Sequence, residues 1–120
     1  MKNIFTLLAI ASLVASSSFT QAQTICEEGF ADIYACDGYD LYTHFPLSAV
    51  GGGDNGNDCW GWVDADSGRE FVLFGRSNGM SVVEITDPLS PSFIANLPTA
   101  SYPSLWRDIK VIGDYAFNVS

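Results

Sequence analysis

The chain has 120 residues, of which 14 are acidic and 5 are basic, and its net charge at pH 7 is −9. This charge excludes a general nucleic-acid binder, which needs clustered Lys and Arg to neutralise phosphates, and it disfavours docking on anionic membranes. Hydrophobic residues make up 48% of the chain and charged residues 16%, which excludes a disordered acidic tail. The length leaves room for one small domain.

The first 22 residues have the pattern of a secretory leader. Lys2 gives a positive start, residues 4–14 form an apolar run, and Thr20-Gln21-Ala22 places small residues before a cleavage point. The alternative, a transmembrane helix, needs about 20 apolar residues, and this run is shorter. The sequence therefore predicts a signal peptide over residues 1–22 and a secreted protein at the cell surface or outside the cell. It predicts no membrane insertion within this segment and no nucleic-acid partner.

Export permits disulfide bonds, and the chain has three cysteines. Cys26 and Cys36 lie ten residues apart within a short N-terminal segment, residues 23–40. We expect them to form a disulfide that restrains this segment by about 2–3 kcal/mol. Cys59 opens an apolar run and follows Asp58, so it lacks the basic neighbour that activates a thiol. We expect Cys59 to be a buried small hydrophobe.

From residue 39 onward the pattern is typical of β-structure. Short runs rich in aromatic and β-branched residues alternate with turn signals made of Gly, Pro, Asn, Asp and Ser. Outside the leader no stretch has a sustained apolar period of 3.6 residues, so helices should be scarce. The expected strands are residues 60–63, 71–74, 81–85, 93–97, 108–112 and 115–119.

Two spacings indicate a repeat. Asp58 and Asp108 lie at the start of two expected strands, 50 residues apart. Phe71 and Tyr115, 44 residues apart, open the strands that follow. A period between roughly 40 and 50 residues with four strands per unit is the signature of a β-propeller blade.

A third correspondence concerns the start of this region. Residues 42–46 echo residues 94–98, which contain an expected outer strand. Residues 41–45 should then be an outer strand without a sheet of its own, which awaits inner strands from elsewhere in a ring. We therefore expect an all-β, β-propeller-like fragment over residues 41–120: one four-stranded antiparallel blade plus parts of two neighbouring blades. This would be the N-terminal portion of a longer protein.

Residues 75–79 match the G-x-S-x-G pattern of serine hydrolases. That mechanism needs a helix directly after the serine, whereas here an expected strand follows and the single histidine, His44, lies upstream. Asn78 and Gly79 both accept positive φ and lie between two apolar runs, which favours a hairpin turn. His44 is then a polar position on the expected edge strand.

The Gly-rich run over residues 51–58 is the most unusual composition in the chain. The side-chain oxygens of Asp54, Asn55, Asn57 and Asp58 could wrap a calcium ion, although their spacing does not fit the helix-loop-helix calcium pattern. The alternative is a flexible link between the closing strand and the first blade, because Asp and Gly are ordinary loop formers. The sequence assigns no other metal, no cofactor and no catalytic residue.

Aromatic and charged residues near the expected inner strands form a candidate ligand face. Trp60 and Trp106 could stack on sugars or peptide side chains at a channel opening, together with Asp58, Arg107 and Asp108. The alternative for the aromatics is packing between adjacent sheets. Arg107 and Asp108 together could form an ion pair at the channel rim.

Several motifs occur in order between about Cys26 and Ser120. They are GNDCWGW (56–62), GRE (68–70), Gly75 with SNG (77–79), VEITDP (83–88), LPT (97–99) and WRDIKV (106–111). Together they resemble the start of the choice-of-anchor B family of secreted proteins, built from LVIVD-type repeats. The resemblance implies an exported, β-propeller-like protein whose relatives carry different C-terminal attachment segments. It implies no settled activity, so it transfers no catalytic residues.

Two functional hypotheses follow from these patterns. The first is a non-enzymatic binding or adhesion scaffold on an exported, surface-associated propeller, with an extracellular protein or glycan as its ligand. The alternative is a propeller hydrolase or lyase whose site lies at the channel mouth, includes Asp58, Arg107 and Asp108, and is completed by further blades.

Overall fold

The computed structural model describes residues 23–120, so the predicted signal peptide lies outside the described residues. The described chain is all-β, as expected, and its strands form three antiparallel sheets joined by loops and one short 3-10 helix, η1 (Leu47–Val50). In this part of the chain no helix is long and apolar enough to cross a bilayer. The strands are β1 (Phe30–Ala31), β2 (Tyr34–Ala35), β3 (Gly56–Val63), β4 (Glu70–Arg76), β5 (Gly79–Glu84), β6 (Ser92–Pro98), β7 (Asp108–Ile112) and β8 (Tyr115–Val119).

The central sheet is a four-stranded meander in the order β3-β4-β5-β6, and it confirms the expectation of one four-stranded antiparallel sheet. Each strand covers or nearly covers a run that the sequence predicted, because apolar and β-branched residues suit a pleated surface with buried faces. A connection of two residues, Ser77 and Asn78, joins β4 to β5. Such a short connection forces the two strands to be antiparallel neighbours.

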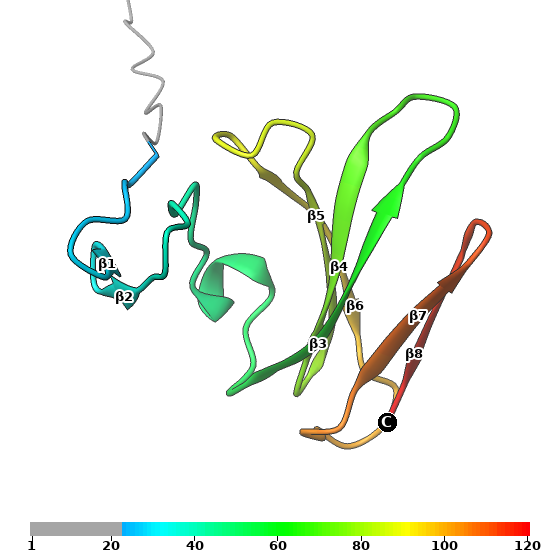
Figure 1. The fold of residues 1–120 in the computed structure, drawn as a ribbon. Coiled ribbons are helices and arrows are strands. Elements are labelled where there is room, and N and C mark those ends of the chain that lie inside the picture. The colour runs from blue at the N-terminus through cyan, green and yellow to red at the C-terminus, as the bar shows by residue number, and fades with distance from the viewer. Residues whose placement is uncertain (1–22) are drawn as a thin grey trace, which may run out of the picture.

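A second hairpin, β7–β8, packs against one face of the central sheet (Figure 1). The buried core between them is formed by Leu73 and Met80 from the sheet and Ile109 from β7, whose side chain is fully buried. Trp62, Val82 and Val111 surround this core. Burial of apolar surface between the two elements therefore joins the hairpin to the sheet.

The register of the strands repeats between the β3–β4 hairpin and the β7–β8 hairpin. Adding 50 to the number of a β3 residue gives a β7 residue, and adding 44 to the number of its β4 partner gives the β8 partner of that β7 residue. The two hairpins are thus equivalent in pairing as well as in sequence spacing. The corresponding pairs are Trp62–Phe71 with Ile112–Tyr115, Gly61–Val72 with Val111–Ala116, Trp60–Leu73 with Lys110–Phe117, and Cys59–Phe74 with Ile109–Asn118.

Because side chains alternate across a strand, this register assigns two faces to the central sheet. The covered face, which packs on β7–β8, carries Trp60, Trp62, Phe71, Leu73 and Val82. The open face carries Cys59, Gly61, Val72, Phe74, Ser81 and Val83. In the described residues no strand covers the open face, which is overlaid in part by the segment before β3.

Residues 41–45 do not form the expected outer strand. Leu41 makes a single bridge with Thr24, with N–H to O distances of 2.8 and 2.9 Å, and Thr43 Oγ1 donates to the carbonyl of Pro88 at 3.3 Å. No strand edge of the described residues lies alongside this segment, so no ladder forms. His44 consequently lies in a loop rather than on an edge strand, and its ring centroid is 5.1 Å from that of Tyr34.

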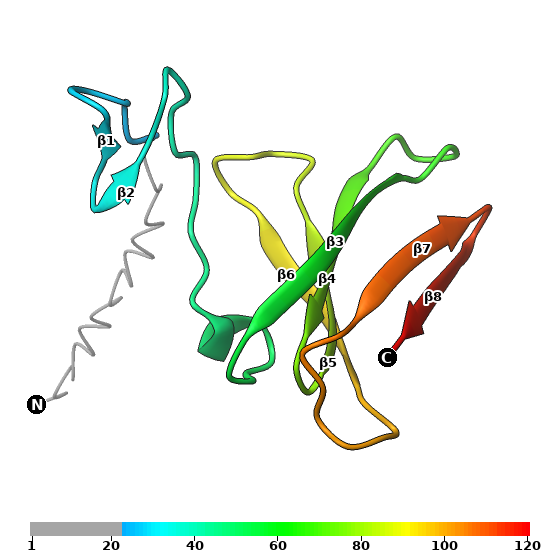
Figure 2. The ribbon, with the colours of Figure 1, turned by 60° about the horizontal axis from the view of Figure 1, so that its bottom comes forward.

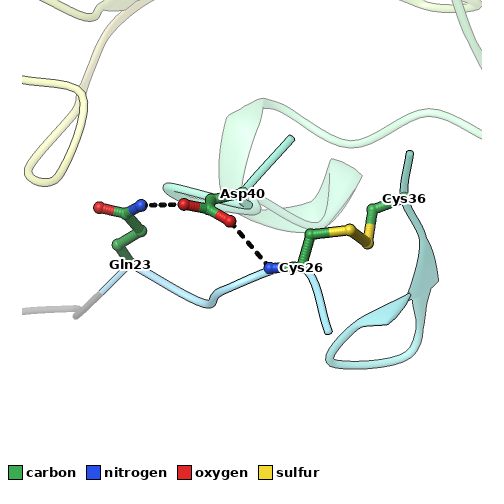
Figure 3. Close-up of a disulfide and its surroundings, with 4 residues drawn as sticks. All are labelled: Gln23, Cys26, Cys36 and Asp40. Carbon is green, nitrogen blue, oxygen red and sulfur yellow. Dashed lines mark hydrogen bonds between the residues drawn. A yellow bond between two sulfur atoms is a disulfide. The ribbon is translucent and has the colours of Figure 1, made fainter. Parts of the chain in front are cut away.

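The N-terminal segment is a small unit held by the predicted disulfide between Cys26 and Cys36, whose Cα atoms are 6.0 Å apart (Figure 3). The carboxylate of Asp40 accepts hydrogen bonds from the Cys26 backbone N–H, at 2.8 Å, and from the amide of Gln23. The two-stranded ladder β1–β2 within this unit was not predicted. It is too short to leave an alternating pattern in the sequence.

The expectation that Cys59 is buried is wrong. Cys59 is a free, exposed thiol. It lies on β3, which is an edge strand of the central sheet, and it belongs to the open face. No described element covers that part of the face, so an apolar position in the sequence pattern remains accessible to solvent.

Candidate binding surface at the loop end of the sheet

Three connections meet at one end of the central sheet, which we call the loop end (Figure 2). They are residues 51–55 before β3, the turn 77–78, and residues 99–107 between β6 and β7. Ser77 links them through its backbone, because its N–H donates to the Asn55 carbonyl and its own carbonyl accepts from Ser104 N–H, both at 2.9 Å. The N–H of Thr99 donates to the Asn78 carbonyl at 2.9 Å.

Arg107 is buried inside the loop end. Its Nη2 donates to Thr99 Oγ1 at 2.7 Å and to the Tyr102 carbonyl at 3.4 Å, and its Nε donates to the Ser77 carbonyl at 3.4 Å. The expected ion pair with Asp108 is therefore wrong: within residues 23–120 the salt bridges are formed by other residues. The backbone carbonyls of the surrounding loops occupy the donors that an ion pair would need.

Arg76 is a second buried arginine, with no exposed surface. Its Nε donates to Ser81 Oγ at 2.6 Å, and its Nη1 donates to the Gly52 carbonyl at 2.7 Å and to Asn78 Oδ1 at 2.6 Å. Its Nη2 donates to Asn96 Oδ1. All of these acceptors are neutral, and burial lowers the pKa of Arg76 below its ordinary value. Arg76 thus holds the segment 51–55 against the β4–β5 turn, a role that the sequence alone did not reveal.

The prediction of a hairpin over residues 75–79 is confirmed, since β4 and β5 pair from Arg76–Gly79 onward and no helix follows Ser77. One detail differs. Gly79 has a positive φ of 154°, but Asn78 does not have a positive φ. The Asn78 side chain instead bonds to Arg76 Nη1 and to the Gly51 carbonyl, at 2.6 and 3.3 Å.

Large apolar side chains project from this end into solvent. Tyr102 is 89% exposed, Trp106 is 81% exposed, and Leu105 is also exposed. Two hydrogen bonds hold the loop 99–107 that carries these side chains. The Asn57 amide donates to the Leu105 carbonyl, and Trp106 N–H donates to Ser104 Oγ at 3.1 Å. Exposed Tyr and Trp on a fixed backbone lose little conformational entropy when they bind. Of the predicted ligand face, Trp106 has this arrangement.

The other residues of the predicted ligand face lie where β3 meets β7. Asp58 Oδ2 accepts the backbone N–H of Ile109 at 2.8 Å, and this bond is the main cause that lowers the pKa of Asp58. Lys110 Nζ lies 4.0 Å from Asp58 Oδ2 and 4.6 Å from the ring centroid of Trp60. Asp58, Trp60 and Lys110 therefore join β3 to the second hairpin, while Asp108 is exposed beside them.

Of the four calcium candidates, Asn57 and Asp58 use their side chains in bonds to other segments, and Asp54 and Asn55 are held through their backbones. Asn57 donates its amide to the loop 99–107, Asp58 accepts from Ile109, and Asp54 donates its backbone N–H to Ser77 Oγ at 3.0 Å. Asn55 contributes its backbone carbonyl. Over residues 23–120 no three His, Cys, Asp or Glu side chains gather in a group that could hold a metal ion.

Comparison of the chain with protein-family models, with curated proteins and with solved structures gives no match. The resemblance to the choice-of-anchor B family therefore rests on the sequence motifs alone.

Proposed function

We propose that this chain belongs to an exported, surface-associated β-propeller and serves as a non-enzymatic scaffold for binding or adhesion. The loop end of the central sheet is the proposed binding surface. Its ligand is an extracellular protein or a glycan, recognised by stacking on Trp106 and Tyr102. The closed ring of blades, the export and the surface association are all parts of this proposal.

The observation that carries the proposal is that exposed aromatic side chains lie on a loop that a buried arginine holds in place. Tyr102 and Trp106 are the most exposed of the large side chains at this end. Arg107, which follows Trp106 in the chain, is buried and donates to Thr99 and Tyr102 of the same loop and to Ser77 of the β4–β5 turn. A monomer that holds apolar aromatics in water on a rigid support has a surface suited to contact with a partner.

Two further observations support the wider architecture. The β3–β4 and β7–β8 hairpins have the same register and pack against each other through β7, which fits successive units of a repeat. The Cys26–Cys36 disulfide fits an oxidising compartment outside the cytosol. Sequencing the N-terminus of the secreted protein tests export directly, and we expect it to begin at Gln23.

The hydrolase or lyase hypothesis gains no support from the geometry. Arg107 and Asp58 use their polar atoms in bonds to loop and strand backbone. Ser77 lies in a hairpin turn and not at the start of a helix.

The test is a binding screen of the secreted chain on arrays of glycans and of extracellular proteins. Trp106→Ala and Tyr102→Ala should each remove the binding found for the unaltered chain while leaving the melting temperature unchanged. Tyr39→Ala is the matched control, because Tyr39 is equally exposed but lies in the N-terminal unit. Binding that survives both loop variants, or robust turnover that Asp108→Ala abolishes, would contradict the proposal.

A further inference from the structure

The loop end contains both Asn-Gly pairs of the chain, Asn55-Gly56 and Asn78-Gly79. In such a pair the backbone nitrogen of the glycine can attack the side-chain amide of the asparagine, because glycine has no Cβ to obstruct the approach. The structure places the same chemical pair in two different surroundings. The two pairs can therefore be compared within one molecule.

One feature that favours this attack is common to both pairs. The attacking nitrogen must first lose its proton, and the resulting negative charge is shared with the oxygen of the same peptide group. The Asn55 carbonyl accepts the N–H of Ser77 and the Asn78 carbonyl accepts the N–H of Thr99, both at 2.9 Å. A hydrogen bond to an oxygen that becomes negative is strengthened. Both peptide groups thus receive equal help from their carbonyl partners.

The two attacking nitrogens point in different directions. In an antiparallel ladder, pairs that exchange hydrogen bonds alternate with pairs that do not. The bond at the Asn55 carbonyl makes the pairing of Gly56 with β4 one of the second kind, so the Gly56 N–H points to the free edge of β3. The bond at the Asn78 carbonyl does the same for the pairing of Gly79 with β6, so the Gly79 N–H points toward β4. The nitrogen of Gly79 is therefore held within the sheet, and that of Gly56 is not.

The two asparagine side chains also differ. Asn78 Oδ1 accepts from Arg76 Nη1 at 2.6 Å, and Asn78 Nδ2 donates to the Gly51 carbonyl at 3.3 Å. Asn78 is half-buried and Gly79 is buried. Asn55 is exposed, and within residues 23–120 its side chain forms no hydrogen bond. The Asn55 amide is thus free to turn toward the next nitrogen in the chain, whereas the Asn78 amide is held in place.

We propose that Asn55 is a site of spontaneous deamidation and that the fold protects Asn78 from the same reaction. The Gly56 nitrogen gives its proton to hydroxide and attacks Cγ of Asn55. A new N–C bond forms, and the bond from Cγ to the side-chain nitrogen breaks with release of ammonia. Water then opens the cyclic imide at either of its carbonyls, which leaves aspartate or isoaspartate at position 55. One water is consumed and one ammonia is released, and no oxidant or cofactor takes part.

The modification changes the loop end in two ways. Either product adds a negative charge close in the chain to Asp54 and Asp58, which increases repulsion within the segment before β3. Isoaspartate also inserts a methylene into the backbone between residue 55 and β3. This insertion shifts the carbonyl that accepts from Ser77, and that bond is one of those that join the three loops. Isoaspartate should therefore loosen the segment 51–55 from the β4–β5 turn.

The reaction involves only two consecutive residues, so it does not depend on which further segments complete the proposed ring. Blades of a propeller are arranged around a central channel and pack through their faces. Further blades would therefore leave the inner edge of β3 without a paired strand. Trp106 and Tyr102 take no part in the reaction, so the site is independent of the proposed ligand.

The experiment is peptide mass spectrometry of the folded secreted chain during incubation in mildly alkaline buffer. Peptides that contain Asn55 should gain one mass unit at least about tenfold faster than peptides that contain Asn78, because Asn78 reacts only after local opening of its hydrogen bonds. A methyltransferase specific for isoaspartate should label position 55. In concentrated urea the two rates should become similar, since the local sequences are alike and the fold is lost.

Two variants of Asn55 complete the test, since a Cβ at Gly56 would overlap the ring of Phe74 and disturb the sheet. Asn55→Gln should stop the reaction at this position, because its longer side chain closes a ring much less readily. Asn55→Asp has the charge of the product with an ordinary backbone. Hydrogen exchange at the Ser77 amide should be faster in the chain with isoaspartate than in Asn55→Asp.

Three results would overturn the proposal. The first is an equal or faster reaction at Asn78 in the folded chain. The second is an Asn55 that stays intact in the folded chain while the chain in urea deamidates. The third is a Ser77 amide whose exchange is the same with isoaspartate as in Asn55→Asp, which would show that the inserted methylene does not loosen the loops. Loss of ligand binding in Trp106→Ala has no bearing on these rates, so the proposed function is tested separately.

Discussion

The two ends of the central sheet are made of similar loop residues, but they are held in different ways. At the loop end, two buried arginines bond to carbonyl and side-chain oxygens of three separate connections. At the opposite end, which we call the turn end, the contacts are exposed: Arg69 pairs with Glu84 at 2.6 Å on the surface. Buried donors that lose their partners cost far more free energy than exposed ones. The comparison therefore indicates that the loop end supports the fold and that the turn end tolerates change.

Replacing one arginine at each end gives the largest expected contrast. Arg76→Met should lower the free energy of unfolding by about 3 kcal/mol or more, since it leaves the buried oxygens of Ser81 and Asn96 without their donor. Arg69→Met, at the turn end, should cost much less, because its ion pair with Glu84 is exposed to solvent. Urea unfolding of both variants measures the difference. Equal losses of unfolding free energy would contradict the contrast between the two ends.

Replacing glycines by alanine tests how tightly the backbone is packed at the loop end. A Cβ at Gly79 would overlap the carbonyl oxygen of Leu97, and Gly79 has a φ of 154°. Gly79→Ala should therefore destabilise the chain by about 2 kcal/mol. Gly61→Ala is the control, because a Cβ there meets no atom within 4 Å. The two variants can be compared by thermal unfolding, and a neutral Gly79→Ala would show that the turn is not packed as described.

Arg107 should matter more for order than for overall stability. Arg107→Met removes the donors that bind Thr99 and Tyr102, so we expect a loss of about 1–2 kcal/mol. We also expect faster hydrogen exchange over residues 99–107, with β4 and β5 unchanged. Unchanged exchange in the loop would mean that Arg107 does not fix the proposed binding surface.

The smallest effect concerns the ion pair at the turn end and depends on pH. The Arg69 guanidinium lowers the pKa of Glu84 from 4.5 to about 2. A carboxylate with a lowered pKa stabilises the folded state above its unfolded pKa and loses that contribution as the pH falls. The difference in stability between the unaltered chain and Glu84→Gln should be small at pH 7 and should disappear between pH 4.5 and about pH 2. A difference that grows on acidification would contradict this assignment.

The sequence predicts the strands of the two larger sheets well, because alternation and turn residues are local signals. Runs such as residues 71–74 and 108–112 carry the pattern of their own strand, and the register of the repeat follows from the spacing of Asp58 and Asp108. The ligand role expected of Trp106 stays a prediction, although its side chain is exposed. These features need no knowledge of distant contacts.

The features that were missed or mistaken depend on contacts between distant residues. Arg76 acts on Gly52, 24 positions away, and Arg107 acts on Ser77, 30 positions away. A single sequence gives no sign of such pairs, so Arg107 was assigned to Asp108, its neighbour in the chain. The prediction that Cys59 is buried was wrong for the same reason, because its exposure depends on which element covers the open face.

The central claim is that two equivalent hairpins pack against each other and are joined by Asp58. The amide proton of Ile109 reports on this contact, because it donates to Asp58 Oδ2. An NMR pH titration should show the Ile109 amide shift following a carboxyl group whose pKa lies below 3.8, and Asp58→Asn should abolish that transition. An Ile109 amide that does not respond to pH, or that responds equally in Asp58→Asn, would contradict the account.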